Sequence, residues 1–405
     1  MTLQNAPEST ANAGSVGEVF FAFLRLGLTS FGGPVAHLGY FHGAFVEKRR
    51  WLSERAYADL VALCQFLPGP ASSQVGMAIG LQRAGYLGMF AAWFAFTMPS
   101  AMVLVAFAFG ATALGEIAGT GWIAGVKAAA VAVVAHAVLT MAKTLAPDAK
   151  RAIIAVAAMV VVLLVPNALV QVAVIGAAGL IGFAWLKPEH RDDDVTDAVG
   201  IRVSRRVAVA SLTLFALLLA VLPALAATIE NGALELVDTF YRAGALVFGG
   251  GHVVLPLLHA ELVPTGMVSA DAFLAGYGAA QAVPGPLFTF SAYLGAVSTG
   301  EPSGIVGAVI ALVAIFVPSA LLLVGVLPFW EKLRHARTAR SAIMGLNAGV
   351  VGLLAAALYN PVFTQGVTGT VSLAIAALAF VALAKVQVPA WAVVIAAALV
   401  GALVL

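Results

Sequence analysis

The chain has 405 residues, of which 62% are hydrophobic and only 10% are charged, and its formal net charge is +2. Soluble domains carry about 25% charged residues, so this composition excludes an ordinary soluble protein, and the weak net charge gives no sign of a nucleic-acid partner. The single cysteine, Cys64, excludes an internal disulfide and a thiolate metal cluster. The first 15 residues contain no Lys or Arg, so we expect no cleavable signal peptide.

Long uncharged stretches set the fold class. They cover residues 152–186, 207–229, 272–300, 302–330 and 341–384. About 20 apolar residues cross a bilayer as a helix, so several of these stretches must cross, and the longest can cross twice. The sequence therefore predicts an all-α polytopic membrane protein whose main surroundings are the lipid bilayer.

In chain order, the first repeat (16–186) is predicted to begin with two broken, re-entrant helical hairpins, 20–45 and 57–82. Four crossings follow, near 86–110, 123–142, 152–165 and 168–186. A cytoplasmic polar linker (187–206), which includes Asp192, Asp193 and Asp194, leads to one extra crossing helix (207–229). The second repeat (238–405) is predicted to follow the same plan. Whether one hairpin in each half crosses fully stays open.

The chain repeats itself in blocks. FLRLG at 23–27 returns as FYRAG at 240–244, and QFLPGP at 65–70 returns as QAVPGP at 281–286. A further pair of blocks, in the same order, is TMPS at 97–100 and FVPS at 316–319. Matching blocks with a nearly constant offset indicate two homologous membrane repeats.

The basic residues predict how the repeats are oriented. Lys and Arg fill the loops 48–55 and 143–151 in the first half and 332–340 in the second, and the matching loops of the other half carry none. Because Lys and Arg prefer the cytoplasmic side, the two repeats are expected to have inverted topology, and the extra helix would turn the second one over.

Each half contains two helix breaks within apolar sequence. They are FGGP at 31–34, PGP at 68–70, FGGG at 248–251 and PGP at 284–286. Pro removes a backbone donor and Gly permits turns with positive φ, and inside a membrane such backbone is tolerated only where it is buried in protein or lines a cavity. The helix that starts after each break directs N–H groups and partial positive charge into it. Four such helix N-termini predict an anion site near the membrane midplane.

Polar side chains lie beside these breaks. Ser72, Ser73 and Thr289 offer hydroxyl donors, and Gln65 and Gln281 offer amides. These side chains would complete an oxyanion site.

Arg25 and Arg242 occupy matching positions in apolar segments. A charged side chain at the bilayer centre costs about 2.5–3.5 kcal/mol, so two of them suggest a function, and two guanidiniums suit a tetrahedral oxyanion. The alternative is that each Arg reaches the interface or pairs with a carboxylate such as Glu18 or Asp238.

Some residues support weaker expectations. His37 and His252 are candidate proton-coupling residues, although packing is the simpler role for each. Asp59, near the start of the second hairpin, is expected to be solvated, and Trp330 is expected to anchor the chain at the membrane interface.

Several of these segments resemble the chromate ion transporter family. They include SFGGPVAHLGYF (30–41), LVALCQFLPGPASSQ (60–74) and QAVPGPLFTFSAYLG (281–295), so the resemblance covers both halves. It implies a fused, two-domain long-chain member in the bacterial inner membrane that exports chromate and confers chromate resistance. The pathway residues that it implies are Arg25, Gly32, Gly33, Gln65, Pro68, Gly69, Pro70 and Ser72, with Arg242, Gly249, Gly250, Gln281, Pro284, Gly285 and Pro286 in the second half.

We therefore expect a secondary transporter rather than an enzyme, with no cofactor. The chain has no GxxxxGK[ST] motif for nucleotide binding. ATP is also not needed, because a dianion that leaves a negative interior gains about 4.6 kcal/mol per 100 mV. The inverted repeats would enclose one midplane site and alternate its access between the two sides.

Other readings stay open. Sulfate is also a tetrahedral dianion, so a sulfate or related oxyanion carrier fits the same features, as does an oxyanion channel. A chromate reductase is disfavoured because the chain has one cysteine and no dinucleotide-binding motif. The sequence does not decide whether the protein is a homodimer.

Overall fold

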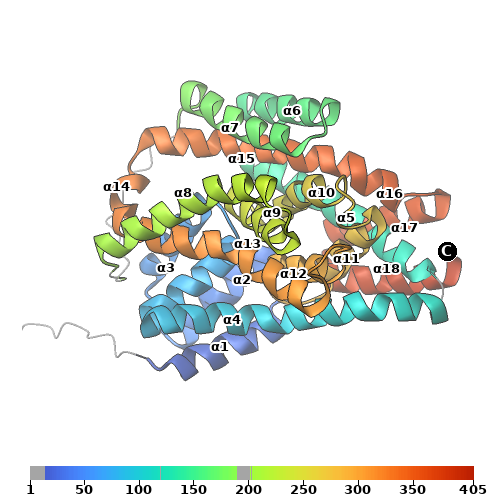
Figure 1. The fold of residues 1–405 in the computed structure, drawn as a ribbon, viewed down its shortest axis with the longest axis horizontal. Helices are drawn as coiled ribbons and strands as arrows, with labels where there is room; N and C mark the ends of the chain where they lie inside the picture. The colour runs from blue at the N-terminus through green and yellow to red at the C-terminus, as the bar shows by residue number, and fades with distance from the viewer. Residues whose placement is uncertain (1–13, 119, 189–200, 202) are drawn as a thin grey trace, which may run out of the picture.

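The computed structural model describes residues 14–118, 120–188, 201 and 203–405. Throughout these residues the regular elements are helices and no strand occurs (Figure 1). The prediction of an all-α membrane protein is confirmed. Most of the predicted linker, including Asp192, Asp193 and Asp194, lies outside the described residues.

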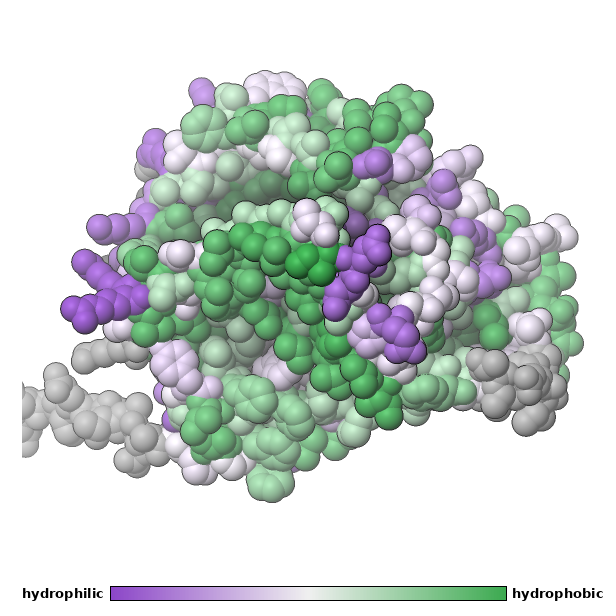
Figure 2. Space-filling view, in the orientation of Figure 1, coloured by the Kyte–Doolittle hydropathy of each residue, from purple (hydrophilic) through white to green (hydrophobic). Residues whose placement is uncertain are grey.

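The surface is that of a protein embedded in lipid. Six helical stretches among the described residues are long and apolar enough to cross a membrane. Hydrophobic side chains cover most of the face seen in Figure 2. Hydrophilic residues gather at its left end, where α14 and the start of α8 lie.

The first half begins with the two broken hairpins. Its elements are α1 (Val16–Thr29), α2 (Gly33–Phe41) with its π-helical continuation η1 (His42–Lys48), α3 (Glu54–Phe66) and α4 (Ala71–Ala118). The side chains of Ser15 and Ser53 accept backbone N–H bonds at the starts of α1 and α3, which fixes where these helices begin. The breaks between α1 and α2 and between α3 and α4 fall at the Gly and Pro residues predicted from the sequence.

The element α4 contains a chain reversal. Ala84 and Gly85 leave helical geometry, and Gly85 has a φ of +67°. A Cβ atom on Gly80 would overlap the carbonyl oxygen of Gly88, so the residues on either side of the turn pack directly against each other. In one straight helix these two glycines would lie about 12 Å apart at 1.5 Å per residue. Residues 71–83 therefore form the second arm of the second hairpin. The helix predicted to cross the membrane starts at residue 86, as expected from the sequence.

Four further helices complete the first half and the link. They are α5 (Gly121–Leu145), α6 (Ala149–Leu164), α7 (Ala168–Trp185) and the linking helix α8 (Arg205–Thr228). Asp148, Asn167 and Ser204 cap the starts of α6, α7 and α8.

The second half repeats this order. Its hairpins are α9 (Gly232–Leu246) with η2 (Gly251–Val253) and α10 (Val254–Leu262), then α11 (Ala270–Ala280) with η3 (Leu287–Thr289) and α12 (Phe290–Ala296). The remaining elements are α13 (Gly304–Val326), η4 (Leu327–Phe329), α14 (Trp330–Arg334), α15 (Arg337–Ala357), η5 (Leu358–Phe363), α16 (Thr364–Gly366), α17 (Thr370–Val381), η6 (Ala382–Val386) and α18 (Ala390–Val404). Here α12 and α13 meet at Gly295 and Gly307, just as the two arms of α4 meet at Gly80 and Gly88.

The two halves exchange their last helices. α5 of the first half packs against α17 and α18 of the second, and α15 packs against α6 and α7 of the first. Small residues allow these close crossings: a Cβ atom on Gly125 would overlap the carbonyl of Ala397, and one on Gly345 would overlap that of Ala178. Reciprocal contacts of this kind are those of a two-fold axis. The fold is therefore a pair of interlocked inverted repeats.

A buried ion pair also joins the halves. Asp59 on α3 accepts hydrogen bonds from Trp330 Nε1 at 3.0 Å and from Arg334 at 3.1 Å. Asp59 and Trp330 are both only 7% exposed. The expectations of a solvated Asp59 and an interfacial Trp330 are therefore wrong, because each provides the other with a buried polar partner across the repeat boundary.

Candidate functional site

The helix breaks of the two halves are joined by reciprocal hydrogen bonds. Gly69 N–H, in the first Pro-Gly-Pro, donates to Val247 O at 2.7 Å. Gly285 N–H, in the second, donates to Ser30 O at 2.9 Å. Ser30 and Val247 end the first helix of their own halves. Each Pro-Gly-Pro loop therefore closes onto the helix break of the opposite half.

The other two breaks reach the same place. A Cβ atom on Gly251 would lie 3.5 Å from Pro34 Cγ and 3.5 Å from Leu287 Cβ. Pro34 belongs to the first break of the first half, and Leu287 follows the second Pro-Gly-Pro. All four breaks thus meet in one region, called here the break junction: residues 30–34, 68–73, 247–251 and 284–289.

Glycine is required in both Pro-Gly-Pro loops for two reasons. Gly69 and Gly285 have φ angles of +114° and +91°, which L side chains rarely adopt. In addition, a Cβ atom on Gly69 would overlap Ser319 Oγ, and one on Gly285 would overlap Ser100 Oγ. Ser100 Oγ also donates a short hydrogen bond to Pro284 O. The last serines of the repeated TMPS and FVPS blocks, Ser100 and Ser319, therefore pack against the Pro-Gly-Pro loops of the opposite half.

This geometry limits what the Pro-Gly-Pro loops can offer a ligand. The N–H groups of Gly69 and Gly285 are bonded to carbonyls of the opposite half. What remains for a ligand is the helix that follows. The first N–H groups of α4, after Pro70, precede the first intrahelical hydrogen bond.

His37 organises the polar side of the break junction. It is fully buried, and its Nε2 lies 3.1 Å from Ser30 O while its Nδ1 lies 3.3 Å from Ser72 Oγ. A carbonyl can only accept, so Nε2 carries the ring proton and Nδ1 accepts from the Ser72 hydroxyl. The Ser72 proton is therefore engaged, and Ser72 is not the free donor that the sequence predicted in this state.

Several buried polar atoms near the break junction have no hydrogen-bond partner among the described residues. They are Ser30 Oγ, Ser73 Oγ, Gln74 Oε1, Thr97 Oγ1 and Ser319 Oγ. Buried polar groups in proteins are nearly always hydrogen-bonded, and an unmade bond costs about 1–3 kcal/mol. A polar ligand at the break junction could satisfy such atoms.

The second half does not reproduce this polar surface. Phe288, Phe290 and Phe316 occupy the positions that match Ser72, Gln74 and Thr97. The hydroxyl of Thr289 donates to Pro286 O at 2.7 Å, within its own turn. Sequence reasoning treated the two halves as equivalent, although ASSQ after one Pro-Gly-Pro and LFTF after the other already signalled the difference.

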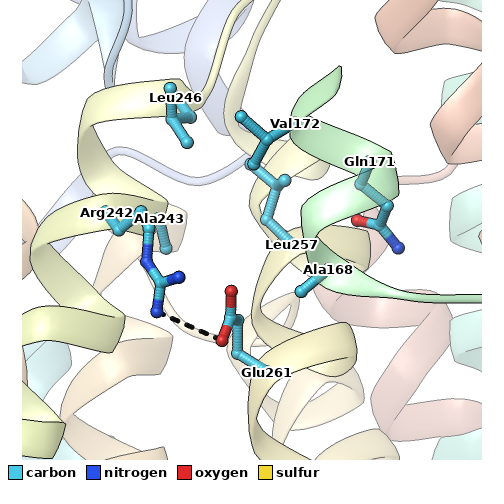
Figure 3. Close-up of a pocket in the computed structure, with 8 residues that line it drawn as sticks. All are labelled: Ala168, Gln171, Val172, Arg242, Ala243, Leu246, Leu257 and Glu261. Atoms are coloured by element: carbon cyan, nitrogen blue, oxygen red, sulfur yellow. Dashed lines mark hydrogen bonds and ion pairs between the residues drawn. The ribbon is translucent and has the colours of Figure 1, made fainter. Parts of the chain in front are cut away.

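The two intramembrane arginines do not share a site. Arg25 lies exposed on α1, and Glu18, proposed as its partner, pairs with Arg83 instead. Arg242 bonds to Asp238 at 2.7 Å. It also bonds to Glu261 at 3.2 Å, as Figure 3 shows. The prediction of two guanidiniums facing one oxyanion is therefore wrong for this conformation, because one faces outward and the other is occupied by carboxylates. The alternative, pairing with Asp238, is what Arg242 does.

The other predicted site residues fall into three groups. Gln65, Gly32 and Gly249 are exposed, Gly33, Gly250, Pro68, Gln281 and Pro284 are half-buried, and Pro70 and Pro286 are buried. Gln281 Nε2 has no hydrogen-bond partner among the described residues. His252 Nδ1 lies 2.8 Å from the hydroxyl of Tyr277. A proton-coupling role for His37 or His252 stays a prediction.

Comparison with known proteins shows which family the chain is similar to. The family model described as chromate transporter matches residues 17–183 and 234–402, one match in each repeat. A probable chromate transport protein of Synechococcus elongatus is 29% identical over 83% of this chain and 82% of its own length. A chromate transport protein of Pseudomonas aeruginosa is 28% identical over 96% of this chain and 92% of its own. No solved structure matches the chain.

Proposed function

We propose that this chain, which belongs to the chromate transporter family, exports chromate from the cytoplasm and thereby confers resistance to it. The observation that carries the proposal is the break junction, where four broken helices meet beside unpartnered hydroxyls. We place the protein in the inner membrane of a bacterial cell, where the interior is negative and drives a dianion outward.

The first half supplies the anion-binding surface in this proposal. Ser73 is 2% exposed and Thr97 is fully buried, and both hydroxyls lack partners among the described residues. Ser73 is free to donate to an oxyanion at the start of α4, where the helix dipole adds partial positive charge, and Thr97 offers a second free hydroxyl on the later arm of α4. The unpaired hydroxyls and the dipole can bind a dianion without any arginine at the site.

The pseudo-symmetry supports alternating access as the mechanism. The hydrogen bonds of Gly69 and Gly285 tie each Pro-Gly-Pro loop to the opposite half, so the loops move with their partners. If the two halves exchange conformations, the same break junction opens to the other side of the membrane. The bound anion then changes sides without leaving its site.

The direct test is chromate uptake into everted membrane vesicles, which turns export into accumulation. We expect accumulation driven by an inside-positive potential, and excess sulfate should compete only weakly. If the vesicles accumulate sulfate and not chromate, the protein is a carrier of another oxyanion. If they accumulate neither, the proposed function is wrong.

Ser73→Ala is expected to raise the KM for chromate roughly 10- to 100-fold in the same vesicles. A hydrogen bond to a charged group contributes about 1.5–3 kcal/mol, and each 1.4 kcal/mol changes affinity tenfold. Ser291→Ala is the matched control, because Ser291 is equally buried but its hydroxyl donates to Phe288 O at 2.8 Å. Equal KM values for the two variants would remove Ser73 from the binding surface.

A further inference from the structure

The second half contains a charged triad that the break junction does not use. Arg242 on α9 bonds to Asp238, one turn earlier, and to Glu261 on α10. The side chain of Asp238 is 8% exposed, and those of Arg242 and Glu261 are each 20% exposed. Figure 3 shows Arg242 and Glu261 facing each other across a pocket lined also by α7. The triad is thus largely enclosed, and Asp238 is its least exposed member.

The charges of the triad do not balance. Two ionised carboxylates share one guanidinium, which leaves one negative charge. An uncompensated buried charge is strongly unfavourable, whereas the addition of one proton makes the triad neutral. Two carboxylates on one cation titrate as a coupled pair, so the proton belongs to the pair rather than to one residue.

Unsatisfied atoms support the same conclusion. Asp238 Oδ1 and Arg242 Nε are buried without hydrogen-bond partners among the described residues. Gln171, on α7, lines the same pocket, is 7% exposed, and its Oε1 also lacks a partner. A proton on Asp238 would give its carboxyl group a hydrogen-bond donor.

The first half has no equivalent of the triad. Phe21 and Ala44 occupy the positions that match Asp238 and Glu261, and only Arg25 matches Arg242. The acidic pair is therefore specific to the second half, as the polar hydroxyl surface is to the first. The proposed anion-binding surface and the charged triad thus lie in different halves of the molecule.

Among the described residues, no further charged side chain is seen to bond to the triad. The linking helix α8 between residues 207 and 228, and α13 along its whole length, carry no titratable side chain against α9. The other charged or titratable groups on α9, α10 and the elements packed against them are Arg205 and Arg206 at the start of α8, and Glu235, Tyr241, His252, His259, Arg337 and Arg340. Tyr241 donates to Phe215 O, His252 bonds to Tyr277, the His259 ring packs on Phe273, and Arg337 and Arg340 lie in the first turn of α15.

We propose that Asp238 and Glu261 hold one exchangeable proton beside Arg242, and that this triad couples proton entry to oxyanion export. The inference rests on the proposed transport function. A proton adds to a carboxylate oxygen from one side of the membrane, the neutral triad is enclosed during the conformational change, and the same O–H bond breaks when the proton leaves to water on the other side. Proton entry down its gradient then drives export of the anion.

The test uses the purified full chain in liposomes that contain a pH-sensitive dye. The liposomes are loaded with chromate at a pH where it is the dianion, and potassium with valinomycin clamps the membrane potential. We expect chromate efflux to acidify the lumen in the wild type. In Glu261→Gln the proton movement per chromate should fall at least tenfold, while exchange of labelled chromate across the membrane stays within about twofold.

Glu235→Gln is the matched control, because Glu235 is an exposed carboxylate on the same helix. It should keep wild-type acidification. Chromate efflux without acidification in the wild type overturns the coupling but leaves the proposed function intact, and full acidification in Glu261→Gln overturns the assignment to the triad. A requirement for a sodium gradient instead of a pH gradient also overturns the proposed proton coupling.

A second measurement does not depend on transport. Infrared titration of the wild type should show one protonated carboxyl band that is lost in Asp238→Asn and in Glu261→Gln, and kept in Glu235→Gln. If chromate transport fails altogether but this band is present, the proton site stands and the proposed substrate is wrong. If the band is absent from a folded wild type, the proton site is wrong.

Discussion

Gly69→Ala is expected to destabilise the folded protein strongly and to abolish chromate transport. The new Cβ atom would overlap Ser319 Oγ and lie 3.1 Å from Gln74 Nε2, and the backbone has a φ of +114°. A left-handed alanine costs about 1–2 kcal/mol, and overpacking typically adds about 1–3 kcal/mol. Any shift that relieves the overlap also weakens the bond from Gly69 N–H to Val247 O, which joins the halves. Thermal unfolding in detergent and vesicle uptake measure the two effects.

Two further variants separate the causes. Gly266→Ala is the control for backbone strain alone, because Gly266 has a φ of +75° but no atom within 4 Å of its added Cβ. Combining Gly69→Ala with Ser319→Gly removes the overlapping oxygen and should recover part of the lost stability. If Gly69→Ala is no worse than Gly266→Ala, the packing of the Pro-Gly-Pro loop on the opposite half is not what requires glycine.

Arg334→Gln is expected to cost about 3–5 kcal/mol of folding stability, the usual effect of removing one partner from a buried ion pair. The Asp59 side chain is 6% exposed, and without Arg334 the Trp330 N–H is the one donor that the described residues leave to its charge. Asp59→Asn should cost less, because Arg334 keeps its bond to Glu331 at 2.6 Å and the asparagine oxygen still accepts from Trp330. Chemical denaturation or thermal unfolding in detergent would give the order of the two variants.

Lys332→Gln is the matched control for this pair. It removes the same charge from the same helix, α14, but Lys332 is exposed. The double variant Asp59→Asn with Arg334→Gln should be more stable than Arg334→Gln alone, because no unpaired buried charge remains. Equal stability of Arg334→Gln and Lys332→Gln would mean that the ion pair contributes nothing across the repeat boundary.

Features that depend on neighbouring residues were predictable from the sequence. Apolar length indicated the crossings, and the Gly and Pro residues at 31–34, 68–70, 248–251 and 284–286 marked the breaks, because φ preferences and missing donors act locally. The end of the second hairpin near residue 82 was also predicted, and the chain turns at Ala84 and Gly85.

Partner choice was not predictable in the same way. Arg25 and Arg242 look alike in sequence, yet one is exposed and the other is held by Asp238 and Glu261. Glu261 lies far enough along the chain that only the packing of α10 on α9 brings it to the guanidinium. The burial of Asp59 was missed for the same reason. Its partner Arg334 lies in the other half of the chain, so neighbouring residues gave no sign of the ion pair.

The sequence by itself determined that this protein is a duplicated, inverted, helical membrane protein with paired helix breaks. These properties follow from apolar length, local backbone chemistry and the order of repeated blocks. Only the tertiary structure decided that each Pro-Gly-Pro loop bonds to the opposite half and that Arg242 pairs with Asp238 and Glu261. It also decided that the hydroxyls of Ser73 and Thr97 find no partner in the part of the chain that the structure describes. Hydrogen bonds and ion pairs select partners by distance in space, and the exchange of helices between the halves sets those distances.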